Sequence, residues 1–258
     1  MEEGRFMKAL IGKRLLLLVF LFLSLSITSC FWTKERKINT VEGLFNQAFT
    51  YYQDEKYRKA REAFEELRDN YPLSKYSIVA ELRIADSYYH EKEYSEAIAH
   101  YEDFRKLHPT NPVISYVIYQ IGMSYFKQIL SIDRDQTFTE NAVKQFEYLI
   151  SRYPSSTYAS SAQKMLEICK EKLAQHEFYV GHLYFKREKY ISALYRFNGI
   201  LENFPKSSIK DKVYLYIGES YLSLEEKEKA KTALTHLVEN YPKSEHYSKA
   251  QKLLAKLR

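Results

Sequence analysis

The 258-residue sequence contains few chain-breaking residues and few cysteines: seven glycines, six prolines and two cysteines. So few turn-forming residues argue against a β-rich enzyme, whose many chain reversals need glycine and proline. Two cysteines exclude a disulfide framework and any zinc site built from four thiolates. The histidines lack the H-E-x-x-H spacing, and there is neither a glycine-rich phosphate loop nor a G-x-S-x-G elbow. We therefore expect a non-enzymatic protein without a cofactor or a metal.

The abundant residues indicate a helical protein with a solvated surface. Hydrophobic residues make up 45% and charged residues 28% of the chain, so a folded core is expected. Tyrosine (24) and phenylalanine (15) are frequent, which together with scarce glycine and proline favours long helices sealed by ring packing. The net charge of +6 is modest, and no basic arm or base-reading motif accompanies it, so nucleic acid is not an expected partner.

The N-terminus has the features of an export signal. Lys8, Lys13 and Arg14 precede an apolar run over residues 15–27, which is shorter than the roughly 20 residues needed to span a bilayer. Residues 27–30, Ile-Thr-Ser-Cys, resemble a bacterial lipobox, in which the cysteine is acylated and becomes the mature N-terminus. We expect residues 1–29 to be a signal peptide and 30–40 a tether, with Cys30 anchored in membrane lipid.

Two features of this signal stay open in the sequence. Translation begins at Met1 or at Met7, and an ordinary signal peptide with an incidental cysteine is the alternative to lipidation. The number of thiols favours lipidation, because Cys169 is the only possible disulfide mate of Cys30. Cys169 itself lies in an apolar helical pattern and is expected to be a buried core thiol.

From residue 41 onward the sequence repeats a pattern of five positions, five times over. A small residue is followed after three positions by tyrosine, and further on an alanine is followed after four positions by a large apolar residue and after twelve by proline. In chain order the five sets are Ala48, Tyr51, Ala60, Phe64, Pro72; Ala85, Tyr88, Ala97, Tyr101, Pro109; Gly122, Tyr125, Ala142, Phe146, Pro154; Gly181, Tyr184, Ala193, Phe197, Pro205; and Gly218, Tyr221, Ala230, Leu234, Pro242.

Each repeat is interpreted as two antiparallel helices, because the small residue and the alanine let two helix backbones approach closely. Proline ends the second helix. A single pair cannot bury its apolar face, so the pairs are expected to stack. The pattern resembles the tetratricopeptide repeat and predicts an all-α, right-handed superhelix of about five helix pairs with a capping helix. The predicted units are 41–74, 75–112, 113–156, 157–207 and 208–244, followed by the cap 245–258.

In such superhelices the first helix of each pair lines the concave surface, at positions three before, one after and four after the small residue. We expect an aromatic groove there that suits an extended apolar peptide. The alternative is that several of these rings pack between repeats. The candidate groove residues are Phe45, Phe49, Tyr52, Leu82, Tyr89, Tyr119, Met123, Phe126, Phe178 and Phe185. The same positions also hold Asp86, His182, Leu215, Glu219 and Leu222.

Two departures from the repeat mark candidate partner contacts. Tyr125 and Ala142 are separated by 17 residues where the other units have nine, so residues around 129–137 are an insertion. Before unit four, residues 157–175 add a helical stretch that can run into the helix holding Gly181. The turn that follows is rich in basic residues, for which a solvated surface is the alternative interpretation. The candidate partner-contact residues are Arg134, Asp135, Lys186, Arg187, Lys189 and Arg196.

The lipobox and the five repeats together resemble the BamD/ComL family of lipoproteins, which belong to the outer-membrane β-barrel assembly (BAM) machine. The most specific segments are Arg-Asp-Gln-Thr at 134–137, Arg-Tyr-Pro at 152–154, and Leu-Ala-x-His-Glu at 173–177, which leads into Tyr-Phe-Lys-Arg at 184–187. The resemblance covers almost the whole mature chain.

This resemblance implies a non-enzymatic scaffold that is anchored by lipid in the outer membrane and faces the periplasm. It implies binding to the barrel protein BamA, mainly through the C-terminal repeats, and to other lipoproteins of the complex. It also implies that the N-terminal repeats engage C-terminal signals of unfolded outer-membrane proteins. Those signals end in an aromatic residue, which agrees with the aromatic groove.

Other functions for an envelope lipoprotein with such repeats stay open at this point. One alternative is pilus secretin assembly, and another is coordination of cell division with the envelope. A third is an accessory subunit of a cell-wall enzyme. The partner that co-purifies with the chain, whether BamA, a secretin or a cell-wall hydrolase or synthase, discriminates among them.

Overall fold

The structure is a computed structural model that describes residues 40–257. The predicted signal peptide, Cys30 and the tether up to residue 39 lie outside the described residues. The chain divides into two compact units, Met1–Gly43 and Leu44–Arg258, and the fold described below is that of the second unit with the first turn of its leading helix. Residues 40–257 are folded into helices joined by short turns, with no strand among them.

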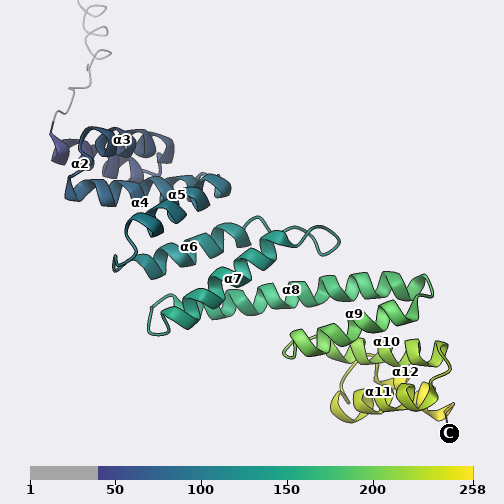
Figure 1. The fold of residues 1–258 in the computed structure, drawn as a ribbon. Helices are drawn as coiled ribbons and strands as arrows, with labels where there is room; N and C mark the ends of the chain where they lie inside the picture. The colour runs from purple at the N-terminus through teal and green to yellow at the C-terminus, as the bar shows by residue number, and fades with distance from the viewer. Residues whose placement is uncertain (1–39, 258) are drawn as a thin grey trace, which may run out of the picture. The chain divides into compact units, whose positions relative to one another are not determined.

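The helices form five consecutive pairs and a final single helix (Figure 1). From α3 to α12 each helix packs against the next one in the chain, and α8 also contacts α10. This all-α arrangement confirms the predicted fold class. The pairs are α2 (Val41–Gln53) with α3 (Tyr57–Asn70), α4 (Lys75–His90) with α5 (Tyr94–Leu107), α6 (Ile114–Phe126) with α7 (Thr137–Arg152), α8 (Ala159–Lys186) with α9 (Tyr190–Asn203), and α10 (Lys210–Ser223) with α11 (Lys227–Asn240), followed by α12 (Tyr247–Ala255).

The second helix of every pair ends two residues before the repeated proline, and the residue between them is no longer helical. Proline disfavours helical geometry in the residue that precedes it. All five of these residues leave the helix with φ between −126° and −135° and ψ between 55° and 58°. In each case the backbone N–H still donates to the carbonyl four residues earlier, so the last turn stays closed. These end residues are Tyr71, His108, Tyr153, Phe204 and Tyr241.

The turn inside four of the five pairs contains a residue in the left-handed conformation, and none of these residues is glycine. Their φ values are 58° for Glu55, 65° for Lys92, 59° for Glu188 and 62° for Glu225. The next residue donates its N–H to the carbonyl of the repeated tyrosine, as Glu93 does to Tyr88 at 2.9 Å. This is a Schellman-type helix end, in which glycine is the usual left-handed residue because it has no Cβ.

We expect Lys92→Gly to raise the free energy of unfolding by about 0.5–1 kcal/mol, because it removes the Cβ strain of the left-handed conformation. Lys231→Gly is the matched control, since Lys231 is an exposed lysine in the interior of α11. Glycine there is expected to cost about 1 kcal/mol. Urea unfolding followed by circular dichroism measures both variants, and a loss of stability in Lys92→Gly would contradict the strain interpretation.

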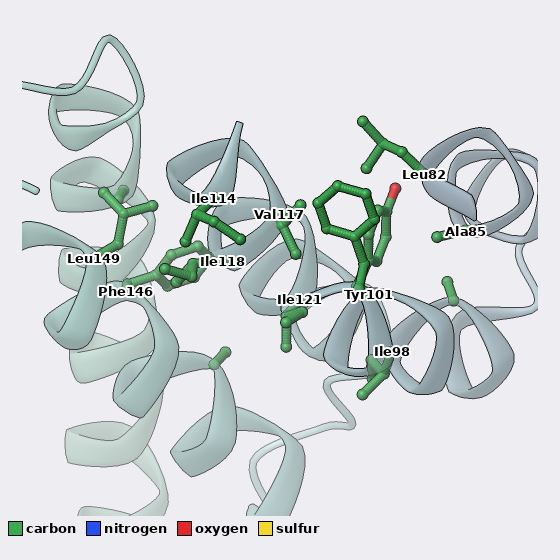
Figure 2. Packing of buried hydrophobic residues seen from close by; sticks show 14 of the residues in the cluster. Leu82, Ala85, Ile98, Tyr101, Ile114, Val117, Ile118, Ile121, Phe146 and Leu149 are labelled. Atoms are coloured by element: carbon green, nitrogen blue, oxygen red, sulfur yellow. The ribbon is translucent and has the colours of Figure 1, made fainter. Parts of the chain in front are cut away.

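The core lies between the paired helices, where the repeated small residues meet large apolar side chains. Figure 2 shows this packing where α6 meets α7, with Ile114 and Ile118 beside Phe146 and Leu149. All four side chains are buried. The same cluster extends through Tyr101 of α5 to Ala85 of α4, so one apolar core runs through three successive pairs.

Helix α8 is the longest element, with 28 residues, because the helical stretch before unit four continues into the first helix of that unit. Its first half packs on α7 and its second half on α9. Cys169 in its first half is fully buried, which confirms the prediction of a core thiol. Burial raises the pKa of this thiol to about 12, so the reactive thiolate is not populated at neutral pH.

Candidate partner-binding sites

A cleft of about 840 Å³ lies where the insertion of unit three meets α8 and α9. Residues 133–137 of the insertion form one wall, Leu173, His176 and Glu177 of α8 line it next, and α9 contributes residues from Tyr195 to Asn203. The side chains that line the cleft include both acidic and basic groups. The cleft therefore offers a polar docking surface with an aromatic side chain, and the insertion that forms one wall is more than 50 residues from the α9 residues that form another.

The insertion is held in place by a buried amide and by a histidine from α8. The Gln136 side chain is buried, and its Nε2 donates to the carbonyl oxygens of Ser131 and Arg134, both at 3.0 Å. His176 Nδ1 donates to the Ile132 carbonyl oxygen at 2.6 Å. These bonds fix the insertion against α8, because buried polar groups of a loop need partners. Gln136 and His176 are positioning residues for the cleft.

The two aspartates of the insertion stay ionised at neutral pH. A hydrogen bond from Ser131 lowers the pKa of Asp133, and hydrogen bonds from Thr137 lower the pKa of Asp135, with a smaller contribution from His176. The Asp135 carboxylate accepts the backbone N–H of Thr137 at 2.9 Å, at the start of α7. Asp135 directly precedes the N-cap residue Gln136, so its negative charge lies at the N-terminus of α7.

The opposite wall carries an internal ion pair and an exposed ring. Arg196 donates to both carboxylate oxygens of Glu177, at 2.9 and 3.2 Å, and joins α9 to α8. Tyr195 beside it is 78% exposed, and Ile191 one turn earlier is 74% exposed. Large apolar side chains so exposed on one helix face are typical of an interaction surface.

The structure brings together three of the six predicted partner-contact residues. Arg134, Asp135 and Arg196 line the cleft. Lys186, Arg187 and Lys189 are exposed on the turn between α8 and α9, and they do not line the cleft. Sequence reasoning missed Glu177, Tyr195 and His176 as members of this site. A helical projection of α9 could have identified Tyr195. This residue is exposed although it lies between the buried Leu194 and the packed Arg196.

The candidate groove residues of α2 lie in two sets of ring contacts. Phe45 lies 5.9 Å from Phe49 and 4.8 Å from Tyr76 between ring centroids. Tyr52 contacts Tyr57 at 5.5 Å and His90 at 5.9 Å. The side chains of Phe45, Phe49 and Tyr52 are half-buried; Phe45 and Tyr52 pack against neighbouring helices, whereas Phe49 contacts Phe45 of its own helix.

Four of the positions assigned to the groove are buried, which corrects the prediction for them. Leu82 and Phe178 are each 8% exposed, Leu215 is 2% exposed, and all three belong to the apolar core. Asp86 is 1% exposed, because its carboxylate accepts the hydroxyls of Tyr101 and Tyr116 and pairs with Arg83. None of the four is available to a partner in this conformation. At these positions, the residue at the fixed offset from the small residue points into the core and not toward the concave surface.

The other groove candidates are half-buried and pack against the core clusters: Tyr89, Tyr119, Met123, Phe126 and Phe185. Tyr119 meets Tyr158 at 5.4 Å and Tyr89 meets Tyr94 at 5.5 Å, so rings of adjacent helices fill the space between repeats. Residues 40–257 hold no group of three or more histidine, cysteine or acidic side chains placed to bind a metal. Over the same residues, no helix combines the length and apolarity needed to cross a bilayer.

The family model YfiO, described as an outer membrane lipoprotein, matches residues 38–235 of this chain. The chain belongs to the YfiO family. The matched residues include the insertion of unit three, the long helix α8 and both walls of the cleft. Family membership confirms the resemblance found in the sequence.

Relatives with curated names agree with the family. The chain is 28% identical to the outer membrane protein assembly factor BamD of Rickettsia prowazekii over 191 residues, which cover 73% of this chain and 76% of that protein. It is 25% identical to BamD of Pasteurella multocida, with 72% and 76% covered. A match to BamD of Caulobacter vibrioides is 32% identical over 98 residues but covers only 38% of this chain and 32% of that protein.

Similar solved structures are repeat proteins of low sequence identity. The TPR2AB domain of yeast Sti1 in its pHSP90 complex is 15% identical, with a TM-score of 0.44 and coverage of 84% of this chain and 82% of that one. A tetratricopeptide repeat protein from Parabacteroides merdae is 16% identical, with a TM-score of 0.41 and coverage of 86% and 87%.

Proposed function

We propose that this protein is a non-enzymatic lipoprotein scaffold for the assembly of β-barrel proteins in the outer membrane. The observation that carries the proposal is the match to the YfiO family over residues 38–235, together with relatives named as outer membrane protein assembly factors. Acylation of Cys30 would anchor the chain in the outer membrane, with the helix pairs in the periplasm. The helix pairs then offer several surfaces to partners and do no chemistry themselves.

The cleft is our proposed docking site for a BamA-like barrel protein and its accessory lipoproteins. Its walls are positioned by Gln136 and His176 and do not depend on a partner for their shape. Arg134 and Asp135 are exposed at the rim of the cleft, so they can release bound water and pair with charged groups of a partner. Tyr195 supplies an exposed ring to the lining, and tyrosine is among the residues that dominate binding energy at interfaces.

The rings of α2 and α4 are our proposed site for the C-terminal signals of client proteins. Phe49 and Tyr52 present half-buried rings, and the guanidinium of Arg83 lies 5.3 Å from the centroid of Tyr52. Rings with a nearby cation suit a peptide that ends in an aromatic residue and a carboxylate. This site lies on the first two helix pairs, far along the chain from the cleft.

The double variant Arg134→Glu and Tyr195→Ala is expected to reduce co-purification of the BamA-like protein by about tenfold or more, because it removes a rim charge and the exposed ring. The variant's melting temperature is expected to stay close to that of the unchanged chain, since both side chains are exposed. Lys231→Glu is the matched control for a surface charge change on another face of the protein.

A depletion experiment tests the function independently of the cleft. Depleting the chain in its host should lower the amounts of barrel proteins in the outer membrane, and unchanged amounts would overturn the proposed function. Normal co-purification by the double variant would instead overturn only the placement of the partner in the cleft.

A further inference from the structure

A second charged and aromatic surface lies away from the cleft, on the first helices of the last two pairs. We call it the basic-aromatic face and define it by Lys186, His182 and Phe185 of α8 and Lys212 and Tyr216 of α10. Its rings form a connected cluster around Tyr216. The Tyr216 ring centroid lies 5.0 Å from that of His182 and 5.1 Å from that of Phe185, both edge to face. Phe178 lies beneath, 5.3 Å from Tyr216.

The cations of this face are not neutralised inside the protein. Lys212 Nζ lies 4.5 Å from the ring centroid of Phe178, over its face. Among the described residues, neither Lys186 nor Lys212 forms an ion pair. Three carboxylates that α8 and α10 carry nearby are engaged elsewhere. Asp211 accepts the hydroxyl of Ser244. Glu177 pairs with Arg196 at 2.9 Å, and Glu219 pairs with Lys249 of α12 at 2.5 Å.

The pKa of His182 is affected by the same positive charges. Burial lowers the pKa of His182, and the positive charges of Lys186 and Lys212 lower it further. No carboxylate contributes to this shift. The positive charge of the face therefore comes from Lys186 and Lys212, and a carboxylate brought to the face would offset it.

We propose that the basic-aromatic face binds an acidic peptide segment of a partner protein, in which carboxylates alternate with aromatic side chains. The lysines come from two adjacent helices and flank the rings, so an extended segment that crosses α8 and α10 meets cation, ring and cation in series. The carboxylates would pair with Lys186 and Lys212, and an aromatic side chain would pack on the exposed edges of Phe185 and Tyr216. This proposal does not depend on the proposed function, because no residue of this face lines the cleft or belongs to the rings of α2 and α4.

The test uses the full chain in detergent and a fluorescein-labelled peptide of repeated Glu-Glu-Phe, followed by fluorescence anisotropy. We expect saturable binding that weakens at high salt, because screening reduces attraction between exposed charges. The double variant Lys186→Glu and Lys212→Glu is expected to raise the Kd by about tenfold or more. The control variant Lys231→Glu and Lys243→Glu makes the same change in net charge at exposed lysines of the last pair and is expected to bind normally.

Three further measurements make the result decisive. A peptide of repeated Glu-Glu-Ser should bind more weakly, because it lacks the rings, and a peptide of repeated Lys-Lys-Phe should not bind. Equal loss of binding in both double variants would overturn the proposal, since net charge alone would then explain it. Binding of a soluble short-chain phosphatidylglycerol that depends on Lys186 and Lys212, without binding of the acidic peptide, would also overturn it in favour of a lipid headgroup.

Discussion

Replacing Asp86 with alanine is expected to lower the free energy of unfolding by about 3–5 kcal/mol, the range for breaking a buried charged network. Asp86 is 1% exposed on α4. Its Oδ1 accepts the hydroxyls of Tyr101 at 2.6 Å and Tyr116 at 2.7 Å, and its Oδ2 accepts Arg83 Nη1 at 2.6 Å. The network therefore ties α4 to α5 and α6, and so joins the second helix pair to the third.

The large loss of stability is expected because the partners of Asp86 stay in the protein without an acceptor. Without the carboxylate, two buried hydroxyls and a half-buried guanidinium lose their acceptor, and unpaired buried groups keep their full desolvation cost. Burial, together with the negative charge of Asp86, already raises the pKa of Tyr101, so this hydroxyl stays protonated as a donor. Asp103→Ala on the exposed side of α5 is the control and should change stability by less than about 0.5 kcal/mol. Urea unfolding measures both, and equal small effects would contradict a stabilising role for the network.

Gly181→Ala and Gly199→Ala are expected to change stability in opposite directions, although both glycines lie inside helices. A Cβ added at Gly181 of α8 would lie 2.7 Å from Phe197 Cε1 and 3.1 Å from Arg196 Cβ. Phe197 is fully buried and cannot move aside, so overpacking is expected to cost about 1–3 kcal/mol beyond the gain in helix propensity. At Gly199 of α9 the nearest atom would be Asn203 Nδ2 at 3.9 Å.

The second glycine isolates the steric effect from the helix-propensity effect. Gly199→Ala is expected to raise the free energy of unfolding by up to about 1 kcal/mol, because alanine favours the helix and meets no close neighbour. Differential scanning calorimetry of the two variants and the unchanged chain gives the comparison. If Gly181→Ala proved as stabilising as Gly199→Ala, the helix contact between α8 and α9 would be looser than the structure indicates.

The helix pairs could be predicted from the sequence because their signals are local and periodic. Proline at Pro72 and its four counterparts ends each second helix two residues before it, and the structure shows this at every pair. The small residues and their large apolar partners were also assigned correctly to the contact between helices. The family resemblance, drawn from the insertion and the long helix, is confirmed.

What the sequence could not show depends on contacts between distant segments. The burial of Asp86 at a groove position could not be predicted, because the groups that donate hydrogen bonds to its carboxylate, two tyrosines and an arginine, come from three different helices. The cleft depends on His176 reaching Ile132, which is 44 residues earlier. The left-handed turns escaped notice because glutamate and lysine occupy them where glycine is usual. The binding roles of the cleft, the groove and Cys30 stay predictions.

The uninterrupted course of α8 has a consequence for how such a protein can be divided. Leu166 and Cys169 belong to the core of the second and third pairs, whereas Ala174 and Phe178 belong to the core of the fourth and fifth. One backbone thus carries side chains of two cores within four turns, with no loop between them. Repeat arrays commonly gain or lose whole units at their linkers. Here the boundary between the two cores falls inside α8 and not in the turn between α7 and α8, so recombination or proteolysis at this boundary would sever a helix and expose both cores together.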